Sequence, residues 1–332
     1  MSDLFTSVDG KFNLLCVGLS LIAFGAGGIK PCVSAFMGDQ FKSDQGHLLQ
    51  KAYGAFYWSI NFGSFFSFIA MPRIREAFGY GWAFGVPGIL MGIATVIFWL
   101  GRKHYVRVPP TRESKRAGFF AVTWYALTHG SERKSGQKFW DVARNKFTNE
   151  EVDAAKSVGP ILSIFALIPA FWALFDQSNS TWVLQGNKMV FIPLTGFWKS
   201  ALGWFFGDQI TAENMQSANP AIVMLLVPLL TLGVYPRLKT WTTPLRRMGC
   251  GMFIAAFSYV IVGWLQQRIE AGEQLSVAWQ VLPYVFLTTG EVLISATGLE
   301  FAFTQAAPEM KSTIMSFWLL TVAVGNALVS II

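Results

Sequence analysis

Charged side chains are scarce in this sequence. Asp, Glu, Lys and Arg make up 14% of its 332 residues, whereas soluble globular domains carry roughly 25%. Cysteine and histidine occur only three times each, and the cysteines (Cys16, Cys32 and Cys250) all fall in apolar stretches. An odd number of cysteines in such surroundings argues against a disulfide framework and against a zinc site.

Motifs of catalysis and nucleotide binding are also missing. The sequence has no P-loop, HExxH, CxxC or nucleophile elbow, which are patterns that hold phosphates, zinc or an activated nucleophile. A membrane-embedded enzyme would need a convergent set of such groups. We therefore predict a protein that is not an enzyme and that uses no cofactor and no metal.

Apolar residues are abundant instead, at 53% of the chain with 30 Phe and 13 Trp. Eight apolar stretches are long enough to cross a bilayer as helices. They cover residues 12–37, 54–71, 82–101, 158–177, 219–235, 248–265, 279–303 and 313–332. The sequence thus predicts an all-α polytopic membrane protein. The last stretch is still apolar at Ile332, which we interpret as a sign that the chain is incomplete.

The distribution of positive charge predicts the topology. Alternating spans place residues 38–53, 102–157, 236–247 and 304–312 on one side, with 19 of the 26 Lys and Arg. By the positive-inside rule this side is cytoplasmic. The net charge of +7 is then explained by topology, and we expect no nucleic acid partner. We predict a multi-pass protein of the bacterial cytoplasmic (inner) membrane, with residues 102–157 as a basic cytoplasmic linker that holds one or two lateral helices.

One lysine lies inside the first apolar stretch. Lys30 stands between glycines and Pro31, about eight residues from the first polar cluster. A charge in the hydrocarbon core costs roughly 2.5 kcal/mol or more, so it persists where it faces a wet cavity or a partner. The alternative is a lysine that snorkels to the interface from near a helix end.

Three further pairs recur at a spacing of four, which places both members on one helix face. They are Tyr57 with Asn61, Trp172 with Asp176, and Glu291 with Ser295. An ionisable group within a span indicates function by default. Alternatives remain open, because Asp176 could mark an ordinary helix end and Glu291 could be a paired structural carboxylate.

For the other candidates, a purely structural role is at least as well supported as a functional one. Asn61 and Asn219 are amides in apolar surroundings and could bond between helices. Tyr57, Trp172 and Trp318 could be packing residues. Glu300 lies nine residues past Glu291, on the opposite face of a straight helix, and we expect it to be a charge partner near the cytoplasmic end.

One cation and two carboxylates at membrane depth, with amides and aromatic rings, would suit a zwitterion. Its carboxylate would lie near Lys30 and its amine near Glu291. Carboxylates in such surroundings can also take up and release protons, since burial disfavours their charged form. The hypothesis that follows is uptake of a small zwitterion coupled to protons.

Several motifs resemble signatures of the proton-dependent oligopeptide transporters, in the order in which that family carries them. They are GAGGIKP at 25–31 with GDQF at 38–41, FYWSINFGS at 56–64, FWALFDQ at 171–177, GEVL at 290–293 and MSFW at 315–318. The resemblance implies the major facilitator fold, with twelve spans in two bundles. The eight spans here then resemble helices 4 to 11. Residues 1–101 would be the second half of the N-terminal bundle, 102–157 the linker, and 158–332 a truncated C-terminal bundle.

The resemblance also implies roles for individual residues. Lys30 would contact the peptide carboxylate and take part in proton coupling, Glu291 would bind the amino terminus beside Ser295, and Asp176 would carry the proton. The remaining pocket residues would be Tyr57, Asn61, Trp172, Asn219 and Trp318. Asp176 departs from the commoner Glu, and its shorter side chain changes its reach. The partners would be di- and tripeptides, protons and the lipid bilayer, the driving ion would be the proton, and the protein would be monomeric.

The implied function is proton-coupled symport of di- and tripeptides by alternating access. Two alternatives remain. One is a transporter of the same fold for another solute, such as nitrate or a modified amino acid. The other is a truncated remnant that does not transport, since the acidic-and-arginine motif of the family's first helix is absent from the sequence.

Overall fold

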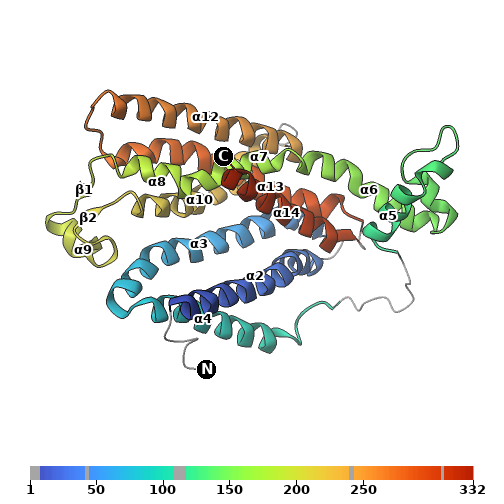
Figure 1. The fold of residues 1–332 in the computed structure, drawn as a ribbon, viewed down its shortest axis with the longest axis horizontal. Coiled ribbons are helices and arrows are strands. Elements are labelled where there is room, and N and C mark those ends of the chain that lie inside the picture. Colours follow the sequence, from blue (N-terminus) through green and yellow to red (C-terminus); the bar gives the residue numbers. More distant parts are fainter. Residues whose placement is uncertain (1–7, 42–44, 108–116, 239–242, 308–309, 332) are drawn as a thin grey trace. The chain divides into compact units, whose positions relative to one another are not determined.

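The computed structural model of the protein describes residues 8–41, 45–107, 117–238, 243–307 and 310–331 (Figure 1). The chain divides into two compact units. The first comprises Met1–Gln40, Thr111–Leu162 and Ala302–Leu319, and the second comprises Phe41–Pro110, Ser163–Phe301 and Leu320–Ile332. The division into helix bundles and a linker that the sequence suggested stays a prediction.

Helices account for most of the described chain. The longer ones are α2 (Val8–Asp39), α3 (Gly46–Phe78), α4 (Tyr80–Gly101), α6 (Asn149–Phe165), α12 (Pro244–Glu270), α13 (Val281–Gln305) and α14 (Lys311–Ile331). The shorter ones are α5 (Phe119–Thr128), α7 (Ile168–Asp176), α8 (Thr181–Gly186), α9 (Gly196–Phe206), α10 (Ala218–Pro228) and α11 (Tyr235–Leu238). Short 3₁₀ helices are η2 (Gly130–Glu132), η3 (Asp141–Asn145), η4 (Gln177–Asn179), η5 (Asn214–Ser217) and η8 (Val277–Gln280), and η6 (Leu229–Val234) is a π-helix.

The predicted all-α membrane architecture is confirmed, with one difference in the spans. Among the described residues, six helical segments are long and apolar enough to cross a membrane: Gly10–Asp39, Tyr80–Gly101, Asn214–Leu238, Pro244–Glu270, Val277–Gln305 and Lys311–Ile331. A seventh arises if Asn149–Phe165 and Ile168–Gly186, which are bent by 42°, count as one span. The eighth predicted stretch, 54–71, lies inside α3, which is not among them. Its Tyr, Trp, Ser and Asn side chains interrupt the apolar run.

The segments between these helices hold shorter elements. The described part of 102–157 contains the short apolar helix α5 and the start of α6, and its role as a cytoplasmic linker stays a prediction. The segment between α8 and η5 forms an antiparallel hairpin, in which β1 (Ile192–Pro193) pairs with β2 (Gln209–Ile210) and α9 follows β1 in the chain before β2. Trp198 and Trp204 are exposed on α9, as suits side chains at a membrane interface.

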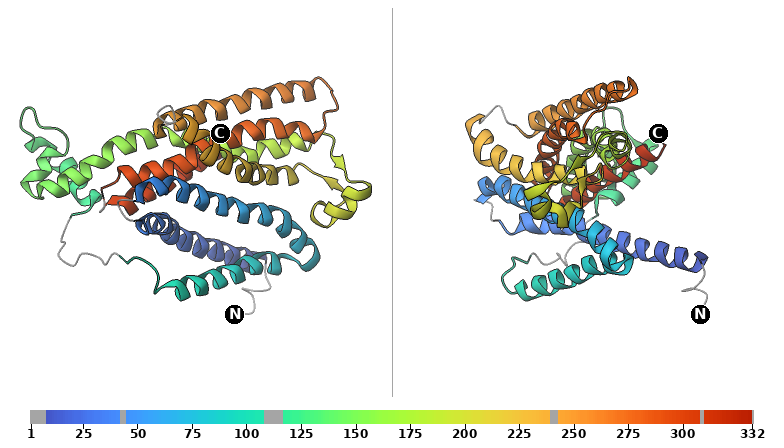
Figure 2. Two further views of the ribbon diagram at one scale, coloured as in Figure 1. Left: turned by 180° about the vertical axis from the view of Figure 1, so that it is seen from behind. Right: turned by 90° about the vertical axis from the view of Figure 1, so that its left-hand side faces the viewer.

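Close helix packing in the second unit depends on glycine at two places. Gly79 joins α3 to α4 with a φ of 83°, a conformation that glycine adopts without strain, and the two helices turn back on each other there (Figure 2). Gly251 on α12 faces Gly290 on α13, where an added Cβ at Gly251 would lie 2.8 Å from the Gly290 carbonyl oxygen. Small residues at such a crossing let two helices approach closely.

A small apolar cluster joins α3, α10 and α13. Tyr57, Val223, Val227 and Val292 are its buried members. The helices α3 and α10 run side by side (Figure 1). Val292 of this cluster is the neighbour of Glu291, whose surroundings form the candidate site described below.

Candidate functional site

The carboxylate of Glu291 is buried on α13 and held from two other helices. Its side chain is 5% exposed. The Tyr57 hydroxyl on α3 donates to Oε1, and Nδ2 of Asn219 on α10 donates to Oε2 over 2.6 Å. The same Asn219 nitrogen lies 3.0 Å from the hydroxyl of Thr288, one turn earlier on α13. Hydrogen bonds to both oxygens are what a buried carboxylate requires.

A cavity of about 220 Å³ opens beside this group. Four of the predicted site residues line it, namely Tyr57, Asn61, Asn219 and Glu291. The other lining residues are Ile60, Ser64, Phe68, Phe175, Ser178, Asn179, Gln216 and Tyr284. The fold therefore brings together residues that lie up to 234 positions apart in the sequence.

Some of the additional lining residues follow from helix periodicity. Ser64 and Phe68 continue the face of α3 that carries Tyr57 and Asn61, at intervals of three and four. Tyr284 lies two turns before Glu291 on the same face of α13. Sequence reasoning named only pairs, so it missed these longer stripes. Ser178, Asn179 and Gln216 lie in 3₁₀ segments, and no periodic signal identifies them.

Asn61 makes a different bond from the one its surroundings suggested. Its Nδ2 donates to the carbonyl of Tyr57, one turn earlier on the same helix, over 2.9 Å. It therefore orders its side chain within α3 and does not use this donor to bond to another helix. Its carboxamide remains part of the cavity wall.

Asp176 lies at the C-terminus of α7, next to Phe175 of the cavity wall. Its Oδ2 atom is buried and has no hydrogen-bond partner among the described residues. The carboxyl groups of Asp176 and Glu291 are close enough to interact electrostatically. The alternative that Asp176 simply marks the end of a helix explains its position in the sequence, but it does not explain why Oδ2 is buried.

Glu300 has the role that the sequence predicted. Its carboxylate pairs with the guanidinium of Arg247 on α12 at 3.4 Å. Their side chains are 18% and 9% exposed, respectively. The guanidinium also lies over the Tyr235 ring, 4.4 Å from its centroid. Glu300 is thus a charge partner and does not line the Glu291 cavity.

The remaining predicted site residues are not among those that line the Glu291 cavity. Ser295 is buried on α13 one turn past Glu291. Trp172 on α7 packs edge-on against Phe171 and Phe175, and Gly325 of α14 lies against it. Lys30, exposed on α2, and Trp318, buried on α14, belong to the first compact unit. Their roles, and the pairing of Lys30 with Glu291 across one ligand, stay predictions.

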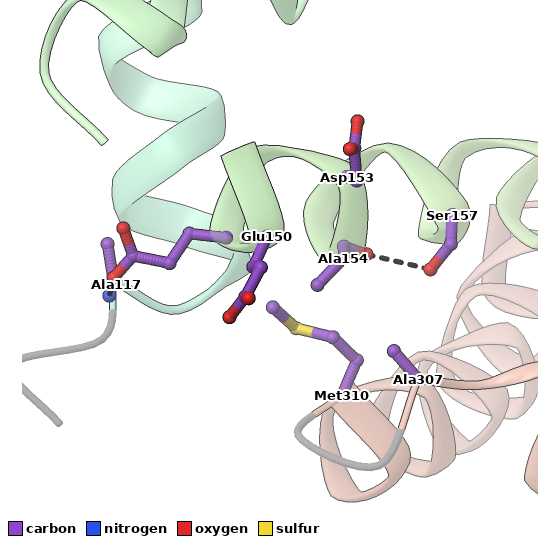
Figure 3. A pocket seen from close by; sticks show the side chains of 8 residues that line it. Ala117, Glu150, Asp153, Ala154, Ser157, Ala307 and Met310 are labelled. Atoms are coloured by element: carbon purple, nitrogen blue, oxygen red, sulfur yellow. Dashed lines mark hydrogen bonds between the residues drawn. The ribbon is translucent and has the colours of Figure 1, made fainter. Parts of the chain in front are cut away.

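A larger cavity of about 480 Å³ lies in the first unit. It has Glu150 and Asp153 of α6 on one side and Ala307 and Met310 on the other (Figure 3). The buried carboxylate there, Glu151, accepts hydrogen bonds from the backbone nitrogens of Ala117 and Thr148 over 2.6 and 2.9 Å. That carboxylate closes the start of α6 and is not available to a ligand. The Glu291 cavity is therefore the better candidate site despite its small volume.

Comparison with known proteins identifies the family. The family model described as the POT family matches residues 2–332. This chain belongs to the POT family. Peptide transporter 3 of Caenorhabditis elegans is 37% identical over 279 residues, which cover 80% of this chain and 38% of the relative. Solute carrier family 15 member 2 of Rattus norvegicus is 34% identical over 301 residues, which cover 86% of this chain and 40% of the relative.

Solved structures of the POT family match the fold. The POT family transporter PepTSo, crystallised in meso, is 40% identical with a TM-score of 0.74, covering 98% of this chain and 71% of that structure. An auto-inhibited POT family peptide transporter is also 40% identical, with a TM-score of 0.73 and coverage of 98% and 69%. The predicted major facilitator fold and the predicted family are thereby confirmed, and the chain is a multi-pass integral membrane protein. It spans about 40% of the length of the curated relatives it matches.

Proposed function

We propose that the protein transports di- and tripeptides across a membrane together with protons, by alternating access. The observation that carries this proposal is the Glu291 carboxylate, buried beside a cavity and held by Tyr57 and Asn219. Membership of the POT family and relatives named as peptide transporters support peptides as the substrate class. The chemistry that this function requires is binding and release.

The Glu291 cavity suits one end of a peptide. At about 220 Å³ it is smaller than the roughly 300 Å³ at which small-molecule pockets begin. A protonated amino terminus would bind the carboxylate, which neutralises a charge that is otherwise balanced only by neutral donors. Lys30 would bind the peptide carboxylate. This assignment rests on the family motif and on the expense of its charge within a span.

Asp176 is the proposed proton carrier. One of its oxygens is buried without a partner among the described residues, and a carboxyl in that state gains from holding a proton. The negative charge of Asp176 disfavours the charged form of Glu291. A proton on Asp176 would therefore favour the Glu291 carboxylate that binds the amino terminus, and proton and peptide would bind cooperatively.

Uptake of a labelled dipeptide tests the proposal. The full-length protein is reconstituted in proteoliposomes under an imposed inward proton gradient, and accumulation is compared with that in vesicles without a gradient. We expect gradient-dependent accumulation. Glu291→Gln should lower it at least about tenfold, because a charge-assisted hydrogen bond contributes roughly 1.5–3 kcal/mol. Lys30→Ala should abolish accumulation.

Matched variants control for general damage. Glu273→Gln changes an exposed glutamate in an ion pair with Arg268, and Lys188→Ala changes an exposed lysine; both should transport normally. Absence of accumulation across a broad dipeptide panel would refute the substrate class. Uptake of nitrate in place of peptides would support the alternative that the family fold serves another solute here.

The same proposal includes the setting of the protein. The basic loops, among them 102–157, would face the cytoplasm by the positive-inside rule. The protein would act as a monomer in a bacterial cytoplasmic membrane. Accessibility of single cysteines to a membrane-impermeant reagent tests this orientation, and labelling of residue 133 from outside intact cells would contradict it.

A further inference from the structure

A carbonyl group on α10 loses its usual helical partner at Pro228. In an α-helix, the carbonyl of Met224 would accept a hydrogen bond from the N–H of residue 228. Proline has no N–H, so that bond cannot form. The π-helix η6 begins at the next residue, Leu229. An unpaired carbonyl within a span is costly because no water is present to replace the missing donor.

Trp58 supplies the missing donor from another helix. Its indole Nε1 donates to the Met224 carbonyl over 3.0 Å. The ring is held in place by stacking on Phe62, with 5.2 Å between the ring centroids. It also packs against the buried cluster that contains Tyr57 and Val227. A single hydrogen bond therefore ties α3 to the point where α10 is interrupted.

The packing around this bond is close. An added Cβ at Gly54, one turn before Trp58, would lie 3.3 Å from the hydroxyl oxygen of Thr231 on η6. The helix α3 thus lies directly against the irregular part of its neighbour. The segment η6 departs from the α-helical repeat, and the contact with α3 adds to the backbone bonds that set its position.

The relative position of these two helices decides how Glu291 is held. Tyr57, the residue before Trp58, binds one carboxylate oxygen from α3. Asn219, five residues before Met224, binds the other from α10. A shift of α10 along α3 by about 1 Å would lengthen one of these bonds beyond the range of a good hydrogen bond.

We propose that Trp58 is a positioning residue, which pairs with the carbonyl released by Pro228 and so keeps α3 and α10 in the register that binds both oxygens of Glu291. The hydrogen bond and its effect on Glu291 do not depend on what the protein transports. Only its consequence for peptide affinity rests on the proposed function.

A double-mutant cycle with Pro228 tests the pairing. Trp58→Phe removes the donor and keeps an aromatic ring, whereas Pro228→Ala restores an N–H that can bond to Met224. The first readout is the rate at which a hydrophobic carbodiimide modifies Glu291 in the full-length protein in detergent, followed by mass spectrometry. Tyr57→Phe, which removes one donor to Glu291 directly, is the reference.

We expect Trp58→Phe to raise the rate about fivefold, the effect of one lost hydrogen bond. In the Pro228→Ala background the same change should alter the rate less than about twofold, because the carbonyl then has a partner in its own helix. An equal effect in both backgrounds would overturn the proposal and leave Trp58 as a packing residue. So would an unchanged rate in Trp58→Phe. If Trp58→Phe aggregates, recovery in the double variant supports the proposal and aggregation there overturns it.

Dipeptide uptake is the second readout. Trp58→Phe should raise KM about fivefold with little change in the maximal rate, and Pro228→Ala should rescue it. If Pro228→Ala removes the effect of Trp58→Phe on the carbodiimide rate but the unchanged protein takes up no peptide, the role of Trp58 stands and the transport proposal is rejected. If the unchanged protein takes up peptide but Pro228→Ala does not alter the effect of Trp58→Phe, the transport proposal stands and the role of Trp58 is rejected.

Discussion

Asn219 donates a hydrogen bond of 2.6 Å to Oε2 of Glu291, and it is the only contribution of α10 to that carboxylate among the bonds of the described residues. The partner on the other oxygen, Tyr57, comes from α3. Three helices therefore meet at one buried charge. Each of the two neutral donors replaces part of the water that the carboxylate gives up on burial.

Asn219→Ala should destabilise the protein by about 1–3 kcal/mol, since it leaves one oxygen of a buried carboxylate without its donor. The measurement is the midpoint of thermal unfolding in detergent. Asn187→Ala, an exposed asparagine past the end of α8, is the control and should leave the midpoint unchanged. Equal shifts in the two variants would show that the bond contributes nothing to stability.

Alanine at the crossing of α12 and α13 should force the helices apart. A Cβ at Gly251 would lie 2.8 Å from the Gly290 carbonyl oxygen, and one at Gly290 would lie 2.9 Å from the Ala255 Cβ. We expect Gly251→Ala and Gly290→Ala each to cost about 1–3 kcal/mol. Because Gly290 adjoins Glu291, the second variant should also weaken dipeptide uptake.

The control for this crossing lies on the same helix. Gly249 has open space around its missing Cβ, so Gly249→Ala should be neutral or should stabilise α12 by up to about 1 kcal/mol. Unfolding midpoints of the three variants make the comparison. Destabilisation by Gly249→Ala as large as that by Gly251→Ala would refute the steric argument.

Removal of Glu300 alone should harm the protein more than removal of the whole ion pair. Glu300→Ala leaves the mostly buried guanidinium of Arg247 without its carboxylate, at a cost of about 3 kcal/mol. The double variant Arg247→Met, Glu300→Leu should recover most of that loss, because no buried charge remains. Glu273→Ala breaks an exposed pair with Arg268 and should cost less than about 1 kcal/mol. A double variant as unstable as Glu300→Ala would contradict this account.

Acid should loosen the segment around η3 at a pH set by Asp141. The backbone N–H of Lys138 donates to its Oδ2 over 2.8 Å, and this bond, together with the nearby charges of Lys156 and Arg144, lowers the pKa of Asp141 below its ordinary value of 3.8. A lowered pKa in the folded state means that the stabilising effect is complete well above pH 3.8 and is lost as the pH falls below it.

Hydrogen exchange of the Lys138 amide measures this effect. Its protection, corrected for the intrinsic rate, should fall in the unchanged protein only at a pH below that at which an unperturbed Asp titrates, about 3.9, because the pKa of Asp141 is lowered. In Asp141→Asn the protection should be lower at neutral pH and nearly independent of pH. A pH dependence that survives in Asp141→Asn would assign the effect to another group.

Composition and charge alone identify the class of this protein, because a bilayer tolerates few spanning structures. Long apolar stretches with few charges must form helices, and the helices are found where the stretches predicted them. Glu300 could also be assigned from the sequence, since helix geometry turns it away from Glu291. The stretch at 54–71 was predicted as a span like the others, but α3 is not among the helices found apolar enough to cross a membrane. The polar residues that lower its hydropathy, such as Tyr57, Asn61 and Ser64, line the cavity.

The site itself was decided by tertiary structure. The sequence marks Tyr57, Asn219 and Glu291 as candidates because polar groups within spans are expensive, but they lie 72 and 234 positions apart along the chain. No local sequence pattern predicts that the Glu291 carboxylate accepts hydrogen bonds from both Tyr57 and Asn219. Likewise, Pro228 predicts that a carbonyl in its helix lacks an N–H donor. Only the packing of α3 against α10 shows that the indole of Trp58 is the donor that replaces it. Local sequence determines which groups need a partner, whereas the packing of distant helices determines which partner they find.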